Sequence, residues 1–478
     1  MKFTFPGADI LKGGEDETVT FNEIISHYAL SLKREDIPEK AWDNAKIFFT
    51  DTVGCIIAGA NEIPSSIAID YAAEFGGKPI CSVVGKKDTK TDPYNAIIIN
   101  GISAHFHDVD DVLVSIDGHP SVAVLPAVLA AAEIVGATGE ETLRAYVTGI
   151  EVLKLIGIGF NKDARYYSIG WHATATLGIF GATAAVGRLF GLTESQLVNA
   201  LGIAASESSG LKGNFGTMVK PLHAGRTGAK AFFAAQIAKR GYISNPAIME
   251  SSEGFAHVTV KTIDISDVKK AIEEGVSAFI DPGLSMKPWP CCRQNHSAIN
   301  AVQNLKTKYS FTAADVEKVE CLVQPVSFDC LKYTNPKTKL QGKFSIQYNV
   351  AVALIKGNIT LEDFDGTDIE DPKVLELMKK ILIKIDDSIA GGMYNNGKYD
   401  SIVKIHLKDG RVLQDWVVYA KGDPANMMTQ QEVMTKFNSC ISRACNKNKL
   451  KQVWDNVFGI DKLDHVRNML DAINDAVI

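Results

Sequence analysis

The sequence has few cysteines, no long apolar run and no concentration of positive charge. Its 478 residues include eight cysteines, and none of them forms the C-x-x-C pair of a zinc knuckle. The longest apolar stretch, residues 176–187, is too short to span a bilayer and ends at Arg188. The net charge is −6, without any run of lysine or arginine. These absences argue against a nucleic-acid or membrane partner and predict a cytoplasmic protein with reduced thiols.

The length and the hydrophobic periodicity predict a large helical domain. A chain of 478 residues exceeds one ordinary hydrophobic core. Apolar residues recur at helical spacing through residues 18–59 and almost continuously through residues 94–241. Glycine is frequent in the second segment although it weakens a helix by about 1 kcal/mol, so we expect helices that approach one another closely. We assign residues 1–280 to this domain.

The pattern changes near residue 280, where prolines interrupt the helical periodicity. Beyond it, strand-like segments alternate with helical ones: strands at 316–326, 381–387 and 401–418, helices at 344–355 and 372–380. Asp409-Gly410 predicts a hairpin within the last strand segment. We therefore predict a smaller α+β domain over residues 281–424, and a helical segment 425–478 that completes the first domain.

One short stretch concentrates ionisable side chains between two apolar segments. Residues 104–120 contain three histidines and four aspartates: His105, His107, Asp108, Asp110, Asp111, Asp117 and His119. Groups of this kind between buried helices must be solvated, paired or used in chemistry. His119 lies in Gly-His-Pro-Ser, a tight turn after the acidic loop, and we interpret it as functional. Asp110 and Asp111 have a second interpretation, in which they cap or pair at a helix end.

Five separate segments place small or aromatic residues beside a histidine, lysine or arginine. They span residues 118–121, 170–174, 214–223, 287–296 and 342–348. Apart from the aspartates of the acidic loop, cationic and imidazole groups outnumber free carboxylates here, which suits a substrate that carries carboxylates. Aspartate and histidine are then left to move protons. Structural roles compete with this interpretation: a helix cap for His172, a solvent-directed side chain for Lys220, and a packing role for His223.

A metal site is another use of histidines and aspartates at this spacing. The run His105-x-His107-x-x-Asp110 is close to the H-x-H-x-D-H ligand set of binuclear zinc hydrolases, but Val109 stands where the aspartate belongs. In a helix, His105 and His107 also point to different faces. The sequence therefore predicts no metal.

Six blocks, in order along the chain, resemble those of the MmgE/PrpD family. They are D-V-D-D at 108–111, G-H-P-S at 118–121, G-W-H-A-T-A-T-L-G at 170–178, N-F-G-T-M-V-K-P-L-H-A-G at 214–225, K-P-W-P-C-C-R-Q-N-H at 287–296 and G-K-F-S-I-Q-Y at 342–348. The family includes 2-methylcitrate dehydratase, cis-aconitate decarboxylase and iminodisuccinate epimerase, and the second, fourth and fifth blocks look closest to the epimerase-like branch.

The resemblance implies a fold, an assembly and a site. The fold is a large all-helical domain assembled from both chain ends plus a smaller α+β lid, and the assembly is a homodimer. The site lies between the domains and uses no metal and no organic cofactor. Position by position, the resemblance assigns catalysis to Asp108, His119, His172 and Lys220. It assigns substrate binding to Cys292, Arg293, His296 and Tyr348.

The chemistry that the family shares requires a base at a C–H bond beside a carboxylate, and fixed cations for the charge that develops there. We expect a cofactor-independent lyase that dehydrates a small di- or tricarboxylate such as 2-methylcitrate. Epimerisation of an iminodisuccinate-like substrate and decarboxylation of a cis-aconitate-like one are alternatives. Val112 stands where decarboxylases have threonine, with one extra residue before His119, which argues against the last. A non-catalytic carboxylate sensor is the alternative from another class.

Overall fold

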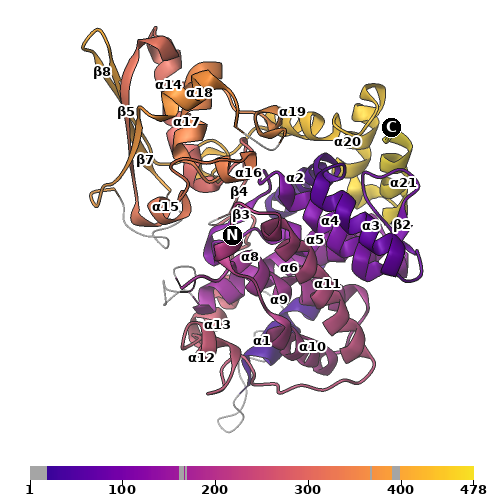
Figure 1. Cartoon of the computed structure of the whole chain (residues 1–478). Coiled ribbons are helices and arrows are strands. Elements are labelled where there is room, and N and C mark those ends of the chain that lie inside the picture. The colour runs from indigo at the N-terminus through magenta and orange to yellow at the C-terminus, as the bar shows by residue number, and fades with distance from the viewer. Residues whose placement is uncertain (1–18, 161–165, 167–168, 282, 367–368, 390–398) are drawn as a thin grey trace.

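Helices dominate the part of the chain that the structure describes, which is residues 19–160, 166, 169–281, 283–366, 369–389 and 399–478 (Figure 1). The structure is a computed structural model. The described residues form two main hydrophobic cores. One contains residues from 21–286 together with residues from 433–477, and the other lies within residues 289–420. The fold class predicted from the sequence, a mainly helical part with a smaller α+β part, is confirmed.

The larger core is built mainly by helices from residues 21–274. They are α1 (Phe21–Ser31), α2 (Glu39–Gly59), α3 (Ile63–Phe75), α4 (Pro93–Phe106), α5 (Pro120–Val135), α6 (Gly139–Phe160), α8 (Ala173–Thr176), α9 (Gly178–Leu189), α10 (Glu194–Glu207), α11 (Val219–Lys239), α12 (Phe255–Thr259) and α13 (Ile265–Glu274). Glycine lets them touch backbone to backbone. A Cβ on Gly101 of α4 would lie 2.4 Å from Gly225 Cα of α11, and one on Gly181 of α9 would lie 2.5 Å from Gly149 O of α6. The close approach expected from the glycine content is confirmed.

The C-terminal segment returns to this helical part, so both chain ends build one core. It forms α19 (Gln430–Ile441), α20 (Leu450–Phe458) and α21 (Val466–Ala476), drawn yellow beside the indigo helices in Figure 1. Phe437 of α19 packs on Gly54 of α2, where a Cβ would lie 2.8 Å from the phenyl ring.

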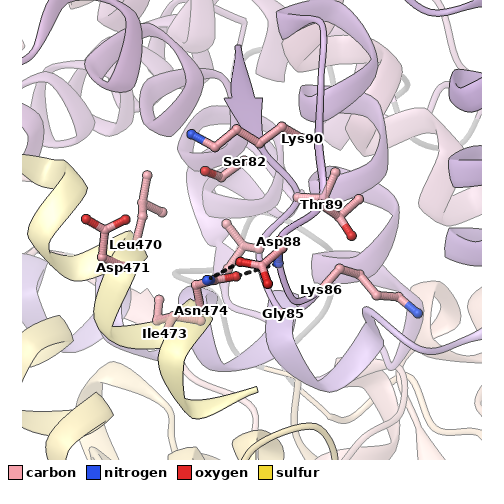
Figure 2. A pocket seen from close by; sticks show the side chains of 12 residues that line it. Ser82, Gly85, Lys86, Asp88, Thr89, Lys90, Leu470, Asp471, Ile473 and Asn474 are labelled. Carbon is pink, nitrogen blue, oxygen red and sulfur yellow. Dashed lines mark hydrogen bonds between the residues drawn. The ribbon is translucent and has the colours of Figure 1, made fainter. Parts of the chain in front are cut away.

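Helix α21 also contacts the loop between two short strands, β1 (Cys81–Ser82) and β2 (Lys90–Thr91). Asn474 of α21 accepts a hydrogen bond from the backbone N–H of Asp88 at 2.7 Å and donates one to its carboxylate at 2.9 Å. A cavity of about 180 Å³ lies at this contact (Figure 2). No residue of the sequence-predicted site lines it.

The α+β part contains a four-stranded sheet of order β6-β5-β7-β8. The strands are β5 (Val316–Val323), β6 (Ile381–Ile385), β7 (Ser401–Leu407) and β8 (Val412–Val417). β5 and β6 are parallel, the other pairs are antiparallel, and Gly410 turns the predicted hairpin with a φ of 88°. The first strand is shorter than the predicted 316–326 because Pro325 begins a helix, where its missing N–H is not needed. Among the described residues of this part, five α-helices accompany the sheet: α14 (His296–Lys308), α15 (Pro325–Cys330), α16 (Lys339–Gly342), α17 (Ile346–Lys356) and α18 (Pro372–Met378).

Among the described residues, no single helix combines the length and the apolar character needed to cross a membrane. Helices α2 and α3 meet both conditions only when they are taken together, and the pair is bent by 79°.

Candidate active site

The acidic loop, residues 107–119, joins α4 to α5 and is held by a short two-stranded contact. β3 (Val112–Leu113) pairs antiparallel with β4 (Leu284–Ser285), which lies far along the sequence. This pairing delivers Lys287, two residues after β4, to the same place. Asp108 enters the loop with a φ of 55°, in the left-handed region that aspartate tolerates better than most residues.

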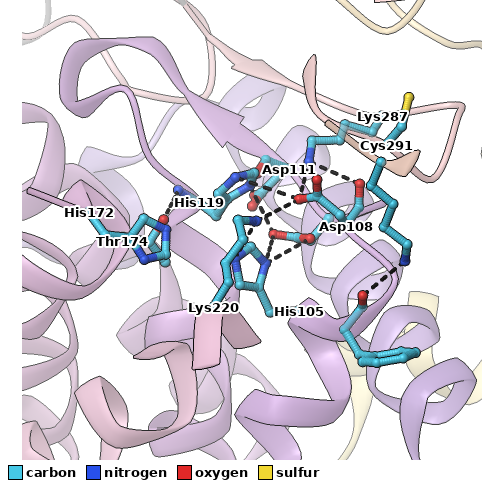
Figure 3. Close-up of polar contacts among 12 residues, drawn as sticks. His105, Asp108, Asp111, His119, His172, Thr174, Lys220, Lys287 and Cys291 are labelled. Carbon is cyan, nitrogen blue, oxygen red and sulfur yellow. Dashed lines mark hydrogen bonds and ion pairs between the residues drawn. The ribbon is translucent and has the colours of Figure 1, made fainter. Parts of the chain in front are cut away.

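Asp108 lies at the centre of a buried ionic cluster (Figure 3). Its Oδ1 accepts hydrogen bonds from Lys220 Nζ and Lys287 Nζ, each at 2.8 Å. Burial raises the pKa of this carboxyl group, but the two ammonium groups outweigh burial and hold the pKa well below its usual range. Asp108 is therefore ionised, and its Oδ2 has no hydrogen-bond partner among the described residues.

His105 continues the cluster through Asp110. Its Nε2 accepts a hydrogen bond from Lys220 Nζ at 2.9 Å, so the ring proton is on Nδ1, which donates to both oxygens of Asp110 at 3.0 and 2.9 Å. Burial, with the charge of Lys220, lowers the pKa of His105 to about 3 despite the opposing effect of Asp110. His105 is thus a neutral link between an ammonium group and a carboxylate.

His119 is placed as a base. Its Nδ1 lies 2.8 Å from Asp111 O and 3.0 Å from Asp110 Oδ2, and both of these oxygens accept hydrogen bonds. Nδ1 therefore carries the proton, and Nε2, which lies 3.9 Å from Asp108 Oδ1, carries the lone pair. Burial and the charge of Lys287 lower the pKa of the ring below its usual value. The imidazole is neutral and able to accept a proton at neutral pH.

His172 borders the cluster on the side of His119 (Figure 3). Its ring is stacked on that of His105 with the centroids 6.0 Å apart. Nδ1 lies 3.0 Å from His223 Nδ1, while Nε2 is buried without a hydrogen-bond partner in the described part of the chain. His172 also precedes α8 as its N-cap, but its side chain makes no capping hydrogen bond there.

Aromatic rings of both parts enclose the Lys220 ammonium group. Its Nζ lies 5.5 Å from the ring centroid of Phe215 and 5.6 Å from that of Phe344. The negative faces of such rings favour a cation. Lys220 is buried, so it is not the solvent-directed side chain that the sequence left as an alternative.

The four predicted substrate-binding residues lie in different surroundings. Cys292 is close enough to Asp108 for its charge, together with burial, to raise the thiol pKa to about 11. Arg293 Nη2 donates to Asp423 Oδ2 at 2.9 Å. His296 Nε2 lies 3.3 Å from Cys291 O.

Tyr348 is held inside the α+β part. Its hydroxyl donates to Asp363 O at 2.6 Å and accepts from Lys339 Nζ at 3.0 Å. The charges of Asp108 and Lys287 act on both Cys292 and His296. The substrate-binding roles of all four residues stay predictions.

Four residues of the cluster were not assigned to the site by the sequence. His105 was weighed only as a metal ligand and Asp110 as a metal ligand or helix-end residue, while Lys287 and Lys343 belonged to selected segments without a role. Lys343 Nζ donates to Phe106 O at 3.0 Å, and burial lowers its pKa to about 8. The sequence feature that could have identified both lysines as site residues is a cation within an otherwise apolar or small-residue segment.

The cluster also offers possible metal ligands. Atoms of His105, Asp108, Asp110 and His119 lie within 4.8 Å of one another. However, protonated Lys220 and Lys287 already donate to Asp108, and Lys220 also donates to His105 Nε2. This donor set does not fit a divalent cation, because the cation would face two ammonium groups at hydrogen-bond distance.

His107 does not join these possible ligands. Its Nε2 lies 3.2 Å from Glu62 Oε1 and 3.3 Å from Ala58 O.

Comparison with known proteins identifies the family of the chain. Residues 23–267 match the MmgE/PrpD N-terminal domain, and residues 289–458 match the MmgE/PrpD C-terminal domain. The chain is 25% identical over 476 residues to a cis-aconitate decarboxylase of Aspergillus terreus, covering 94% of this chain and 95% of that protein. It is 25% identical over 466 residues to the human cis-aconitate decarboxylase, with 94% and 91% covered.

The chain is also similar to a relative with a different activity, at slightly lower identity. The 2-methylcitrate dehydratase of Salmonella typhimurium is 22% identical over 419 residues, covering 83% of this chain and 84% of that protein. Decarboxylases and dehydratases are both lyases, so the relatives agree on this broad class. The chain belongs to the MmgE/PrpD family, as its six sequence blocks predicted.

Proposed function

We propose that this chain is a cofactor-independent lyase that acts on a small polycarboxylate by moving a proton at a carbon beside a carboxylate. The observation that carries the proposal is the lone pair on His119 Nε2, next to the ammonium groups held by Asp108. The names of the relatives, which act on tricarboxylates, support the substrate class.

The charge balance of the cluster supports an anionic ligand. Lys220, Lys287 and Lys343 bring three ammonium groups, whereas Asp108 and Asp110 bring two ionised carboxylates. Removing a proton beside a substrate carboxylate builds negative charge on that carboxylate, and fixed buried cations stabilise this charge more than water does. The surplus positive charge is therefore placed where the transition state needs it.

Dehydration is the reaction that uses the histidines best. His119 takes the proton from carbon through Nε2. His172 Nε2 has no hydrogen-bond partner among the described residues and, when it carries the ring proton, can protonate the departing hydroxyl group. The bonds broken are C–H and C–O, the new bond is the alkene, and the hydroxyl group leaves as water. A hydroxy acid such as 2-methylcitrate has the required arrangement.

Decarboxylation of a cis-aconitate-like acid is the second candidate. Similarity to cis-aconitate decarboxylases over 94% of the chain favours it. Val112 disfavours it, because this apolar residue is buried in β3 at the position where the decarboxylase sequence pattern has a hydroxyl group. Epimerisation requires an acid on the opposite face of the carbon, which His172 supplies only if the substrate lies between the two imidazoles.

A panel of polycarboxylates tests the proposal. We expect turnover of at least one of 2-methylcitrate, citrate, cis-aconitate and an aspartate-derived iminodiacid, recorded as new alkene absorbance, released carbon dioxide or racemisation on a chiral column. His119→Gln is the matched inactive control. Binding of these acids without turnover would overturn the lyase and leave the sensor.

A further inference from the structure

A second cavity lies outside the ionic cluster, along the first half of α11. It has a volume of about 310 Å³, and its polar lining includes Ser209, Asn214, His223, Arg226, Thr227 and Lys230. This volume is within the range of small-ligand sites. None of the lysines or aspartates that meet at Asp108 lines it.

The charged side chains that line this cavity are all basic. Lys230 Nζ is fixed by hydrogen bonds to Glu207 O and Ser209 Oγ, each at 2.8 Å, and the Arg226 guanidinium lies 5.8 Å from the ring centroid of Tyr94. Among the described residues, neither cation has a carboxylate oxygen within 4.0 Å. The charge of Glu207 opposes the lowering of the Lys230 pKa by burial. Two such cations beside a hydroxyl group and an amide suit a small oxyanion.

His223 connects this cavity to the candidate active site. It lines the cavity, and its Nδ1 lies 3.0 Å from Nδ1 of His172. A hydrogen bond between two imidazole nitrogens contains one proton, so one ring donates and the other accepts. If His223 donates, the neutral His172 must carry its own proton on Nε2, toward the cluster. If His172 donates, its Nε2 has a lone pair and cannot protonate a leaving group.

We propose that the cavity binds a small carboxylate or phosphate anion, and that the anion fixes His223 as the donor and His172 as an Nε2–H acid. The effect on His172 as an acid rests on the proposed function. An anion beside Arg226 and Lys230 places negative charge next to His223 and favours the protonated ring, which can only donate through Nδ1. In the empty cavity, burial and the charges of Lys220 and Lys230 lower the pKa of His223 to about 4, so either ring can be the donor. His223 is thus a positioning residue.

Binding is tested by titrating the ¹⁵N-histidine-labelled protein with inorganic phosphate in one arm and citrate in the other. We expect saturable shifts of the His223 and His172 nitrogens, with the stronger arm identifying the source of the anion. Arg226→Gln should weaken binding at least about tenfold, as loss of one charge-assisted contact does. Arg240→Gln, with the same loss of charge at the opposite end of α11, should bind as the wild type does. Equal binding by Arg226→Gln and wild type overturns the site.

Two substitutions of His223 test the connection to His172. The side-chain amide of His223→Asn can donate from the position of Nδ1, whereas the ionised carboxylate of His223→Asp can only accept. We expect the Nε2–H form of His172 in His223→Asn, even without phosphate, and the Nδ1–H form in His223→Asp. In His223→Asp, kcat should be at least about tenfold lower than in the wild type, with KM little changed.

Identical His172 nitrogen shifts in two folded variants would contradict the connection. Thermal melting confirms that both variants are folded. The nitrogen shifts are measured without turnover. A protein that turns over none of the polycarboxylates would therefore contradict the proposed function, while the anion site would still be tested by these shifts.

Discussion

At the scale of single residues, the site depends on one buried carboxylate that holds two buried ammonium groups. An isolated ion at this depth is strongly unfavourable, and hydrogen-bonded pairing is what makes it stable. Asp108 Oδ1 accepts from both Lys220 and Lys287, while Oδ2 is left without a partner among the described residues. The carboxylate therefore fixes the positions of the cations and does not neutralise both of them.

His119 is predicted to be the principal base. His119→Ala should lower kcat at least ~10²-fold with the fold retained, and His119→Gln should be nearly as poor because an amide does not accept a proton. Because burial lowers the pKa of His119, the decline of kcat/KM at acid pH should have its midpoint below the ordinary imidazole value of about 6.5. Recovery of most of the rate in His119→Gln would make His119 a binding residue and His172 the better candidate for the base.

Lys220 is predicted to supply fixed positive charge to a substrate carboxylate. Lys220→Met should lower kcat/KM by a factor on the order of ten to a thousand, the effect of losing one charge-assisted contact. Lys239→Met removes the same kind of charge from the C-terminal end of the same helix, outside both the cluster and the cavity along α11, and serves as the comparison. Steady-state kinetics on a folded Lys220→Met variant that equal those of the wild type would rule out this role.

Asp111 is predicted to make the stability of the protein depend on pH. Burial raises its pKa to about 8, against about 3.9 in an unfolded chain. Between these values the folded state binds a proton that the unfolded state lacks, so this contribution to stability is complete below about pH 4 and is lost as the pH rises toward 8.

Asp111→Asn removes this titration. Its free energy of unfolding, relative to the wild type, should therefore rise by about 1.4 kcal/mol per pH unit between pH 5 and pH 7. Urea unfolding at several pH values measures the difference, with Asp43→Asn on the exposed face of α2 as control. A difference that does not change with pH would show that Asp111 is ionised in the folded protein.

At the scale of elements, the C-terminal helix α19 supports the acidic loop through a hydrogen bond to the loop backbone. Lys436 Nζ lies 2.7 Å from Asp51 Oδ1 and donates to Val109 O, also at 2.7 Å. Burial lowers the pKa of Lys436, but Asp51 outweighs burial and raises it. One buried lysine thus joins the C-terminal helix, α2 and the loop that carries Asp108.

Lys436→Met is predicted to destabilise the protein by up to about 3–5 kcal/mol, because it leaves the carboxyl group of Asp51, whose pKa burial raises, without its ammonium partner. Asp51→Asn combined with Lys436→Met should regain part of this loss, since no charge is then left uncompensated. Urea unfolding of the two variants measures both effects. A double variant no more stable than Lys436→Met would show that packing, and not the ion pair, holds α19 in place.

The elements were largely predictable from the sequence, while the contacts of the site were only partly so. Helical periodicity and the Asp409-Gly410 turn depend on local sequence and appear as expected. The proton positions on His105 and His119 depend on partners brought together by the fold, so no spacing rule gives them. Lys287 reaches the cluster through the pairing of β3 with β4, which are separated by about 170 residues of sequence.

At the scale of the whole molecule, the two parts meet at the acidic loop. Tyr399 from the α+β part donates to Asp117 Oδ1 at 2.8 Å, and Tyr333 donates to Phe215 O at 2.8 Å. Phe215 in turn packs against Phe344 with ring centroids 5.4 Å apart. The α+β part therefore covers a cluster whose acids and bases come mainly from the helical part, and this cover keeps water from the ions.

The most direct test of the central claim is solvent deuterium exchange at the carbon beside a substrate carboxylate. The polycarboxylate panel is incubated with the wild type and with His119→Gln in D₂O and followed by ¹H NMR. We predict that, for at least one acid, the wild type either introduces deuterium at that carbon or converts the acid to product, and that His119→Gln does both at least ~10²-fold more slowly. Equal rates of exchange and of turnover in the two proteins, or bound acid with neither exchange nor turnover, would contradict the account.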